Sequence, residues 1–279
     1  MPTVPPLVLT LPFVAWILLA TLAFGSFAFV VLTRALSDVT PGYVRFVAVT
    51  AAVLALLAYL AQPGPLGLGA GSLAINWTVP DSDWRPLATI LFMVVAVLYG
   101  WRVANQRHAL VLGIVGCALG IAVLGLASLA WTSATADAVP LLVQLAVLSF
   151  VTGGSLAAIV LGHWYLVTPK ISERPLLLQT RLLLAGLIVQ ALLFVTWTTL
   201  GGGPGQGPFD AFTSGPVLLV ILRLLITIAF PIVLTWMAWR TARTRSMESA
   251  TGLLYINFAA VMAGTIGAAA LYVSSGILV

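Results

Sequence analysis

Apolar stretches long enough to cross a bilayer recur along the whole chain, and they constrain its fold more than any motif does. Hydrocarbon offers no partner to a backbone N–H or carbonyl group, so open irregular segments cannot span it and helices are favoured. A spanning helix needs about 20 apolar residues. We therefore predict an all-α integral membrane protein with eight transmembrane helices, at residues 7–35, 43–62, 86–104, 109–131, 139–167, 176–200, 215–239 and 250–276.

The composition indicates the same class of protein. Charged residues make up 7% of the chain and hydrophobic residues 61%, whereas soluble domains carry about 25% charged residues. A soluble catalytic domain is therefore excluded. Cys117 is the only cysteine, which excludes an intrachain disulfide and a cysteine-based metal cluster made by this chain alone.

The charged residues predict the orientation of the spans. On one side lie ten basic residues (Arg34, Arg45, Arg102, Arg107, Lys170, Arg174, Arg181, Arg240, Arg243 and Arg245) and three acidic ones (Asp38, Glu173 and Glu248). The other side holds Asp81, Asp83, Asp137 and Asp210 against Arg85 alone. The positive-inside rule places the first side in the cytoplasm and both termini outside. We expect a multi-pass protein of a cell membrane, with the bacterial inner membrane favoured, and no binding of nucleic acid.

Repeated patterns predict an internal duplication. Three of them recur in the same order at offsets of 129 to 139 residues: 25–32 with 154–161, 101–107 with 239–245, and Gly113 and Gly125 with Gly252 and Gly264. The sequence therefore predicts two membrane repeats of four helices each, residues 1–135 and 136–279. Because four is even, the repeats run in the same direction, around an axis along the membrane normal.

His108 and His163 are the only histidines, and both fall near the predicted cytoplasmic boundary. A b-type haem needs two axial ligands on opposite faces of its ring. The two imidazoles are therefore candidate metal ligands for haem b. The alternative makes them interfacial residues without a ligand, with His163 hydrogen-bonded to a carbonyl at the end of its helix.

The surroundings of His163 also indicate a quinone site. Glu173 follows it in the next loop, and Arg181 lies about a turn and a half into the next span. An imidazole near a carboxylate and a guanidinium can hydrogen-bond a quinone carbonyl and relay its proton. We therefore take His163, Arg181 and Glu173 as candidate catalytic residues. The alternative is a structural loop held by salt bridges.

Arg223 is the second candidate site, because it lies about seven residues inside the seventh span. An unpaired guanidinium at such a depth costs at least about 2.5–3.5 kcal/mol on insertion scales. It should therefore face the bundle, with Gln190 and Gln144 as predicted partners in binding a quinone. The alternative is an arginine that extends to the outer interface. Pro231 is expected to kink the same helix.

Small residues within the spans have a simpler interpretation. Gly113, Gly116 and Gly120 in the fourth span, and Gly264 and Gly267 in the eighth, are expected to form helix-packing faces.

The predicted span count, orientation and duplication resemble the membrane anchor subunits of molybdenum-containing respiratory reductases, the NrfD/DmsC type. The resemblance lies in architecture over the whole length and carries no diagnostic motif. It implies a quinone site within one bundle and docking to an iron–sulfur subunit.

Three functions remain open at this point. The first is a membrane subunit of a respiratory or photosynthetic electron-transfer complex, which handles quinone with or without haem b and associates with other membrane or peripheral redox subunits. The second is a structural subunit of a larger membrane complex, and the third is a small-molecule transporter. No Asp or Glu lies near the middle of any predicted span, whereas ion-coupled carriers usually need one. If the chain serves an enzyme, it does so as the membrane subunit of a quinone-linked oxidoreductase.

Overall fold

The computed structural model describes residues 6–62, 83–105, 109–132, 135–168, 171–203, 206–213 and 216–279. All regular structure in these ranges is helical. The helices are α1 (Pro6–Leu36), α2 (Pro41–Leu60), α3 (Arg85–Ala104), α4 (Leu110–Trp131), α5 (Thr135–Val167), α6 (Arg174–Leu200), α7 (Asp210–Thr213), α8 (Val217–Leu224), the π-helical turn η2 (Leu225–Ala229), α9 (Phe230–Arg243) and α10 (Met247–Ser275).

Eight of these segments are long and apolar enough to cross a membrane, with α8, η2 and α9 forming one continuous span. This confirms the predicted all-α membrane class and its eight spans. The predicted bounds are closest for α3 and α4, each within one residue. They differ most, by four residues, at the start of α5 and at the end of α9, which continues from residue 239 to Arg243. The extra turn carries Arg240 and Arg243, whose exposed side chains let the helix continue beyond its apolar part.

Pro231 changes the helix type of its span, because a π-helical turn precedes it. A proline in a helix has no N–H to donate, and its ring clashes with the carbonyl four residues earlier, here that of Thr227. The chain responds with a π-helical turn just before the proline, in which the Phe230 N–H donates to the Leu225 carbonyl. This wider turn begins two residues after Arg223, and such turns are frequent at functional sites.

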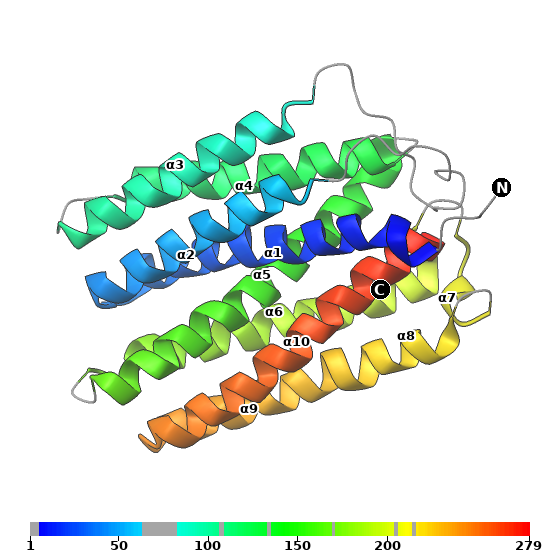
Figure 1. The fold of residues 1–279 in the computed structure, drawn as a ribbon. Helices are drawn as coiled ribbons and strands as arrows, with labels where there is room; N and C mark the ends of the chain where they lie inside the picture. Colours follow the sequence, from blue (N-terminus) through cyan, green and yellow to red (C-terminus); the bar gives the residue numbers. More distant parts are fainter. Residues whose placement is uncertain are drawn as a thin grey trace.

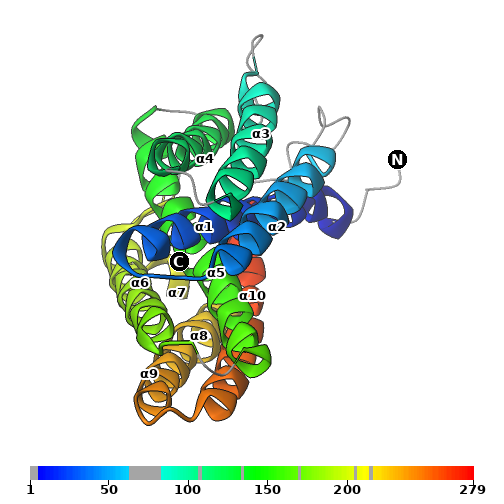
Figure 2. The same ribbon diagram turned by 90° about the vertical axis from the view of Figure 1, so that its left-hand side faces the viewer.

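Helices α1 and α5 form the centre of the bundle. In their most apolar stretches 78% and 72% of the residues are buried, against 33–50% in the other six spans. They also make the most extensive contact of any helix pair. Figure 2 shows α3 and α4 on one side of this central pair, and α6, α8, α9 and α10 on the other.

The helix contacts on the two sides of the central pair correspond. α1 packs against α2 and α4, as α5 packs against α6 and α10. α3 lies between α2 and α4, and α9 lies in the same way between α6 and α10. Each of the central helices also contacts the last helix of the other side, α10 for α1 and α4 for α5.

Glycines let the two central helices approach closely. A Cβ atom added to Gly25 of α1 would overlap the Ser149 carbonyl of α5, and one added to Gly153 would overlap the backbone of Gly25 and Ser26. Small residues at such crossings allow main chains to meet, and close packing holds membrane helices together where the surrounding lipid is equally apolar. The crossing of α1 and α5 therefore depends on both glycines.

Most of the glycines expected to pack do so. Gly113, Gly116 and Gly120 of α4 face side chains of α1, and Gly264 of α10 faces Thr227 and Arg223. Gly267 is the exception, because nothing lies within 4 Å of a Cβ added there. The prediction for Gly267 is therefore wrong, since it points to the open surface of α10 and not to a neighbouring helix.

Charge separates the two ends of the bundle. The ends of α1, α3, α5 and α9 and the starts of α2, α4, α6 and α10 lie together at the left of Figure 1, while the start of α1 and the C-terminus lie at the right. We call the first the basic end, defined by Arg34, Arg45, Arg102, Arg174, Arg181, Arg240, Arg243 and Arg245. The other is the acidic end, defined by Asp83, Asp137 and Asp210 together with Arg85.

An ion pair fixes the start of α3 at the acidic end. The Arg85 Nε and Nη2 atoms donate to the Asp83 carboxylate at 2.8 and 2.6 Å, and the Arg85 backbone N–H donates to the same group at 3.0 Å. Partial burial alone would raise the pKa of Asp83, but these hydrogen bonds and the guanidinium charge outweigh it and hold the pKa below its usual range. The ionised carboxylate is therefore stabilised in the folded protein.

This ion pair predicts a pH dependence of stability. Because the folded-state pKa of Asp83 is lowered, its stabilisation is complete above the unfolded-state pKa of about 3.9 and is lost as pH falls through the folded-state value. We expect Asp83→Asn to lower stability by about 1–2 kcal/mol at pH 7, and the gap to the wild type to close toward pH 3. Thermal unfolding across this range measures the gap.

Asp38→Asn is the matched control for this measurement, because Asp38 is fully exposed and lies 3.9 Å from Arg34. Its effect should be near zero throughout. An Asp83 gap that stayed constant from pH 7 to pH 3 would contradict the proposed role of the carboxylate.

Candidate functional site

His163 lies on the outer surface of α5, in a groove near the basic end. The groove has a volume of about 360 Å³ and is lined by Phe46 of α2, by Ile159, Val160, His163 and Trp164 of α5, and by Tyr255 of α10. Residues four apart lie on one face of a helix, so Ile159 stacks below His163 and Val160 below Trp164. Three helices thus bring one imidazole and three aromatic rings to a single open groove.

The walls of this groove are held in place by close packing on one side. Trp164 lies against the start of α2, where a Cβ added to Gly42 would be 3.0 Å from its ring. Phe46 and Tyr255 are 52% and 48% exposed, so their rings border the groove and face the surroundings of the bundle. His163 makes no hydrogen bond or ion pair with any other residue that the structure describes. Its imidazole is therefore free to bind a ligand that enters from the side.

The other two predicted catalytic residues have partners elsewhere. Glu173 pairs with Arg245, at 2.9 Å between Oε2 and Nη2. A hydrogen bond from its own backbone holds the pKa of Glu173 below its usual range, and the Arg245 charge lowers this pKa further. Arg181 lies over the ring of Trp239, 5.6 Å from its centroid. Neither residue is hydrogen-bonded to His163, so the relay predicted among the three residues stays a prediction.

The haem ligands are placed only in part. His108 lies outside the described residues, so its position relative to His163 is not defined. The described residues that line the His163 groove come from α2, α5 and α10, and not from α4, which follows His108. They offer a single imidazole to an iron atom, and haem ligation by His108 and His163 stays a prediction.

Arg223 and Gln144 meet at a second polar cluster, toward the acidic end. Gln144 Nε2 donates to the main-chain oxygen of Val279 at 2.9 Å, and Arg223 Nε reaches the same oxygen at 3.5 Å. Trp197 Nε1 donates to Gln144 Oε1 at 3.0 Å, so both the nitrogen and the oxygen of the Gln144 amide are hydrogen-bonded. Arg223 is 3% exposed, so its guanidinium faces the bundle and does not extend to the interface.

The two Nη atoms of Arg223 have few hydrogen-bond partners. Arg223 Nη1 donates to Thr227 Oγ1 at 2.9 Å, one turn farther along the span. Arg223 Nη2 is buried and has no hydrogen-bond partner among the described residues. Gly264 provides the space, since a Cβ there would lie 2.6 Å from Nη1. The buried Arg223 guanidinium thus has more N–H donors than hydrogen-bond acceptors among the described residues.

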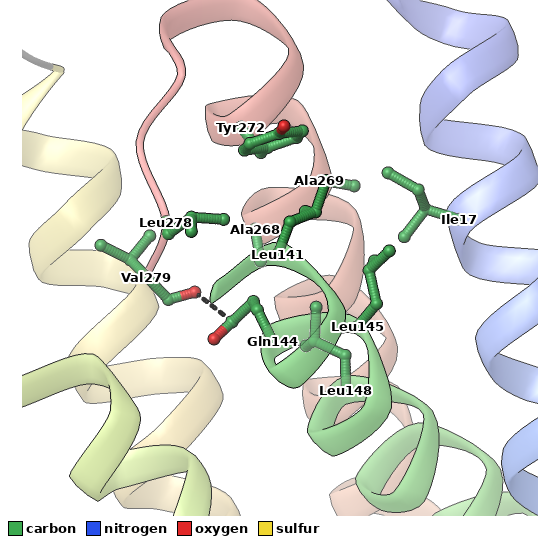
Figure 3. Close-up of a pocket in the computed structure, with 10 residues that line it drawn as sticks. All are labelled: Ile17, Leu141, Gln144, Leu145, Leu148, Ala268, Ala269, Tyr272, Leu278 and Val279. Carbon is green, nitrogen blue, oxygen red and sulfur yellow. Dashed lines mark hydrogen bonds between the residues drawn. The ribbon is translucent and has the colours of Figure 1, made fainter. Parts of the chain in front are cut away.

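The cavity beside this cluster is too small for a quinone. Figure 3 shows Gln144 and Val279 beside it, with Tyr272 of α10 and Ile17 of α1 on its other walls. Its volume is about 10 Å³, which is the space of one water molecule. Gln190 is buried on α6 but forms no described hydrogen bond with Arg223 or Gln144. The structure therefore brings together two of the three residues predicted here, Arg223 and Gln144, beside a cavity that holds no more than one water molecule.

The sequence reasoning missed a polar junction inside the bundle. Gln179 of α6 donates through Nε2 to Tyr43 of α2 at 2.7 Å and to Thr33 of α1 at 3.1 Å, and Tyr43 donates to the Ala157 carbonyl of α5 at 3.0 Å. A second set joins α5, α9 and α10 through Ser155, Thr235 and Asn257, beside the Thr152–Thr265 pair. Both sets could have been predicted from the presence of polar residues within apolar spans.

Comparison with protein-family models, curated proteins and solved structures finds no match to this chain. The fold defines a multi-pass helical membrane protein.

Proposed function

We propose that this chain is a quinone-binding membrane subunit of an electron-transfer complex, and that the quinone head group binds in the His163 groove. The observation that carries the proposal is the position of the imidazole. It lies on the surface of a membrane bundle, has no hydrogen-bond partner among the residues that the structure describes, and is bordered by three aromatic rings.

The groove has the chemistry that a quinone requires. Quinones move within the hydrocarbon, so a site open on the side of α5 receives them without passage through water. The His163 imidazole can donate an N–H to one of the two carbonyl groups of a quinone, which are the strong hydrogen-bond acceptors of the ring. Phe46, Trp164 and Tyr255 offer flat apolar surfaces to the rest of the ring. A volume of about 360 Å³ lies in the range of small-molecule sites.

The predicted duplication is part of this proposal. We infer two parallel repeats of four helices, with α1 equivalent to α5, α2 to α6, α3 to the span that ends in α9, and α4 to α10. The corresponding contacts on the two sides of the central pair support it, as do the repeated sequence patterns. The excess of arginine at one end supports an orientation with the basic end in the cytoplasm and both termini outside. A membrane anchor of the NrfD/DmsC type would share this plan, with a soluble iron–sulfur subunit as the electron donor.

Quinone binding by purified protein tests the proposal. Decylubiquinone and a short-chain menaquinone analogue are titrated into the detergent-solubilised protein, and the quenching of tryptophan fluorescence near the groove gives the dissociation constant. We expect His163→Ala to weaken binding about tenfold, as the loss of one hydrogen bond in a water-poor site does. His163→Gln, which retains an N–H donor, should recover part of the affinity.

His108→Ala is the matched control, because it removes the only other histidine. Retained binding in His108→Ala with weakened binding in His163→Ala supports the groove. Weakened binding in both, together with loss of a reduced b-type absorption band, would assign the two residues to haem. Equal affinity in His163→Ala and the wild type would overturn the proposal. Substrate-dependent uptake by proteoliposomes would then favour the transporter, and stable association with other subunits without quinone the structural role.

A further inference from the structure

Three arginines at the basic end stack on two tryptophans of α9, and one of the three, Arg181, comes from α6. The guanidinium carbons of Arg181 and Arg243 lie 5.6 and 5.2 Å from the ring centroid of Trp239. That of Arg240 lies 5.5 Å from the centroid of Trp236. Stacking on an aromatic ring holds a guanidinium in place while its N–H groups remain at the edge of the pair. We call these five residues the Arg–Trp cluster.

The cluster carries positive charge that no carboxylate neutralises. Arg181, Arg240 and Arg243 are exposed, and none of them pairs with an acidic side chain in the described part of the chain. Glu173, the acidic residue at the start of α6, pairs with Arg245 instead. Three guanidinium groups thus present free donors over a short stretch of surface, which is the arrangement that binds a phosphate through paired N–H groups.

The surface next to the cluster is apolar and faces the membrane. On α9, Val233, Trp236 and Met237 are 50%, 46% and 41% exposed, within about two turns of Arg240. On α6, an apolar groove of about 340 Å³ between α5 and α6 is lined by Ala146, Val147, Phe150, Leu182, Ala185, Gly186 and Val189. One of its lining residues, Ala185, lies one turn from Arg181 on the same face of α6. A ligand that fits both surfaces has an anionic head and an apolar tail.

We propose that the Arg–Trp cluster binds the phosphate of an anionic phospholipid, with an acyl chain along the apolar surface of α6 and α9. The head group is recognised by Arg181, Arg240 and Arg243, and basic positions beside membrane helices are where anionic lipid head groups bind. The site lies between α6 and α9, away from the His163 groove on α2, α5 and α10, so it is independent of the proposed quinone site.

Native mass spectrometry of the full chain tests this site. Protein purified in a neutral detergent is mixed with phosphatidylglycerol, with phosphatidylcholine of the same acyl chains, or with inorganic phosphate. We expect phosphatidylglycerol to remain bound in preference to phosphatidylcholine, and the double variant R181Q/R243Q to reduce its apparent affinity about tenfold. The variant W239L should weaken it as well, because the two arginines lose the ring that positions them.

The double variant R45Q/R102Q is the matched control, because it removes two exposed arginines of the same end that lie on α2 and α3. Unchanged lipid affinity there, with reduced affinity in R181Q/R243Q, locates the site at the cluster. Equal losses in the two double variants would show attraction by net charge alone and overturn the proposal. Inorganic phosphate that bound as well as the lipid would overturn the lipid assignment. Circular dichroism and gel filtration confirm that each variant is folded before the comparison.

Discussion

Gly153→Val is expected to leave no stably folded protein in detergent. A Cβ at this position overlaps the main chain of Gly25 and Ser26, and a valine adds two further methyl groups to the same contact. Flexible side chains can move away from an added atom, but the backbone of a packed helix cannot move without its neighbours. Helix α1 would have to separate from α5 along the most extensive contact in the molecule.

The size of the effect follows from what this contact supports. Overpacking in a core usually costs about 1–3 kcal/mol, when side chains can rearrange. Here the clash is between main chains of the two central helices, so we expect a loss above about 4 kcal/mol, in the range reserved for severe structural defects. Fluorescence-detected gel filtration of a tagged variant should show aggregated protein in place of the wild-type peak.

Two glycines of another spanning helix serve as controls for the Gly153→Val substitution. Gly252 and Gly267 of α10 have nothing within 4 Å of an added Cβ. Gly252→Ala and Gly267→Ala should therefore leave the peak unchanged, or raise stability by up to about 1 kcal/mol because alanine favours the helix. A Gly153→Val peak like that of the wild type would contradict the close crossing of α1 and α5.

The spans could be predicted from the sequence because hydrocarbon imposes a simple condition on length and polarity. Helix α4 begins and ends within one residue of its predicted bounds, 109–131. The end of α9 differs by four residues, since Arg240 and Arg243 are charged and yet continue the helix. Polarity defines where hydrocarbon ends, but it does not define where the backbone stops being helical.

The faces of the helices could not be predicted in the same way. In water an apolar face indicates the core, whereas in a bilayer the lipid-facing surface is apolar as well. Gly267 was therefore expected to pack and instead points to the surface. Glu173, predicted to act with His163, is paired with Arg245, from a connection 72 residues farther along the chain. Contacts of this kind depend on which helices are neighbours.

Arg223→Met is expected to leave the protein as stable as the wild type or to stabilise it. The change removes the donor to one buried hydroxyl, Thr227 Oγ1, which keeps a hydrogen bond of its own. The Val279 oxygen still accepts from Gln144 Nε2 at 2.9 Å, and Thr227 still donates to the carbonyl of residue 223 at 2.7 Å. The buried charge and the unpartnered Nη2 disappear together. Replacement of buried charges by apolar residues of similar volume is often neutral or stabilising, by about 1–4 kcal/mol.

Gln144→Leu is expected to have the opposite effect at the same cluster. It removes the acceptor of the Trp197 N–H and the shortest donor to the Val279 oxygen, which keeps only the 3.5 Å contact from Arg223. A buried polar group without a partner costs about 1–3 kcal/mol, so the free energy of unfolding should fall by this amount. Thermal unfolding of the two single variants in one detergent compares them directly.

The double variant Gln144→Leu with Arg223→Met separates the two contributions. We assume that the Gln144 amide stabilises the cluster and that the Arg223 guanidinium destabilises it. The double variant should then be less stable than the sum of the two single effects predicts, because the Val279 oxygen loses both of its donors. A strong loss of stability in Arg223→Met alone would mean that the guanidinium is a structural donor of the fold. The interpretation of this buried arginine as a net cost would then be wrong, and its contact with the Val279 oxygen would be the reason that the span retains it.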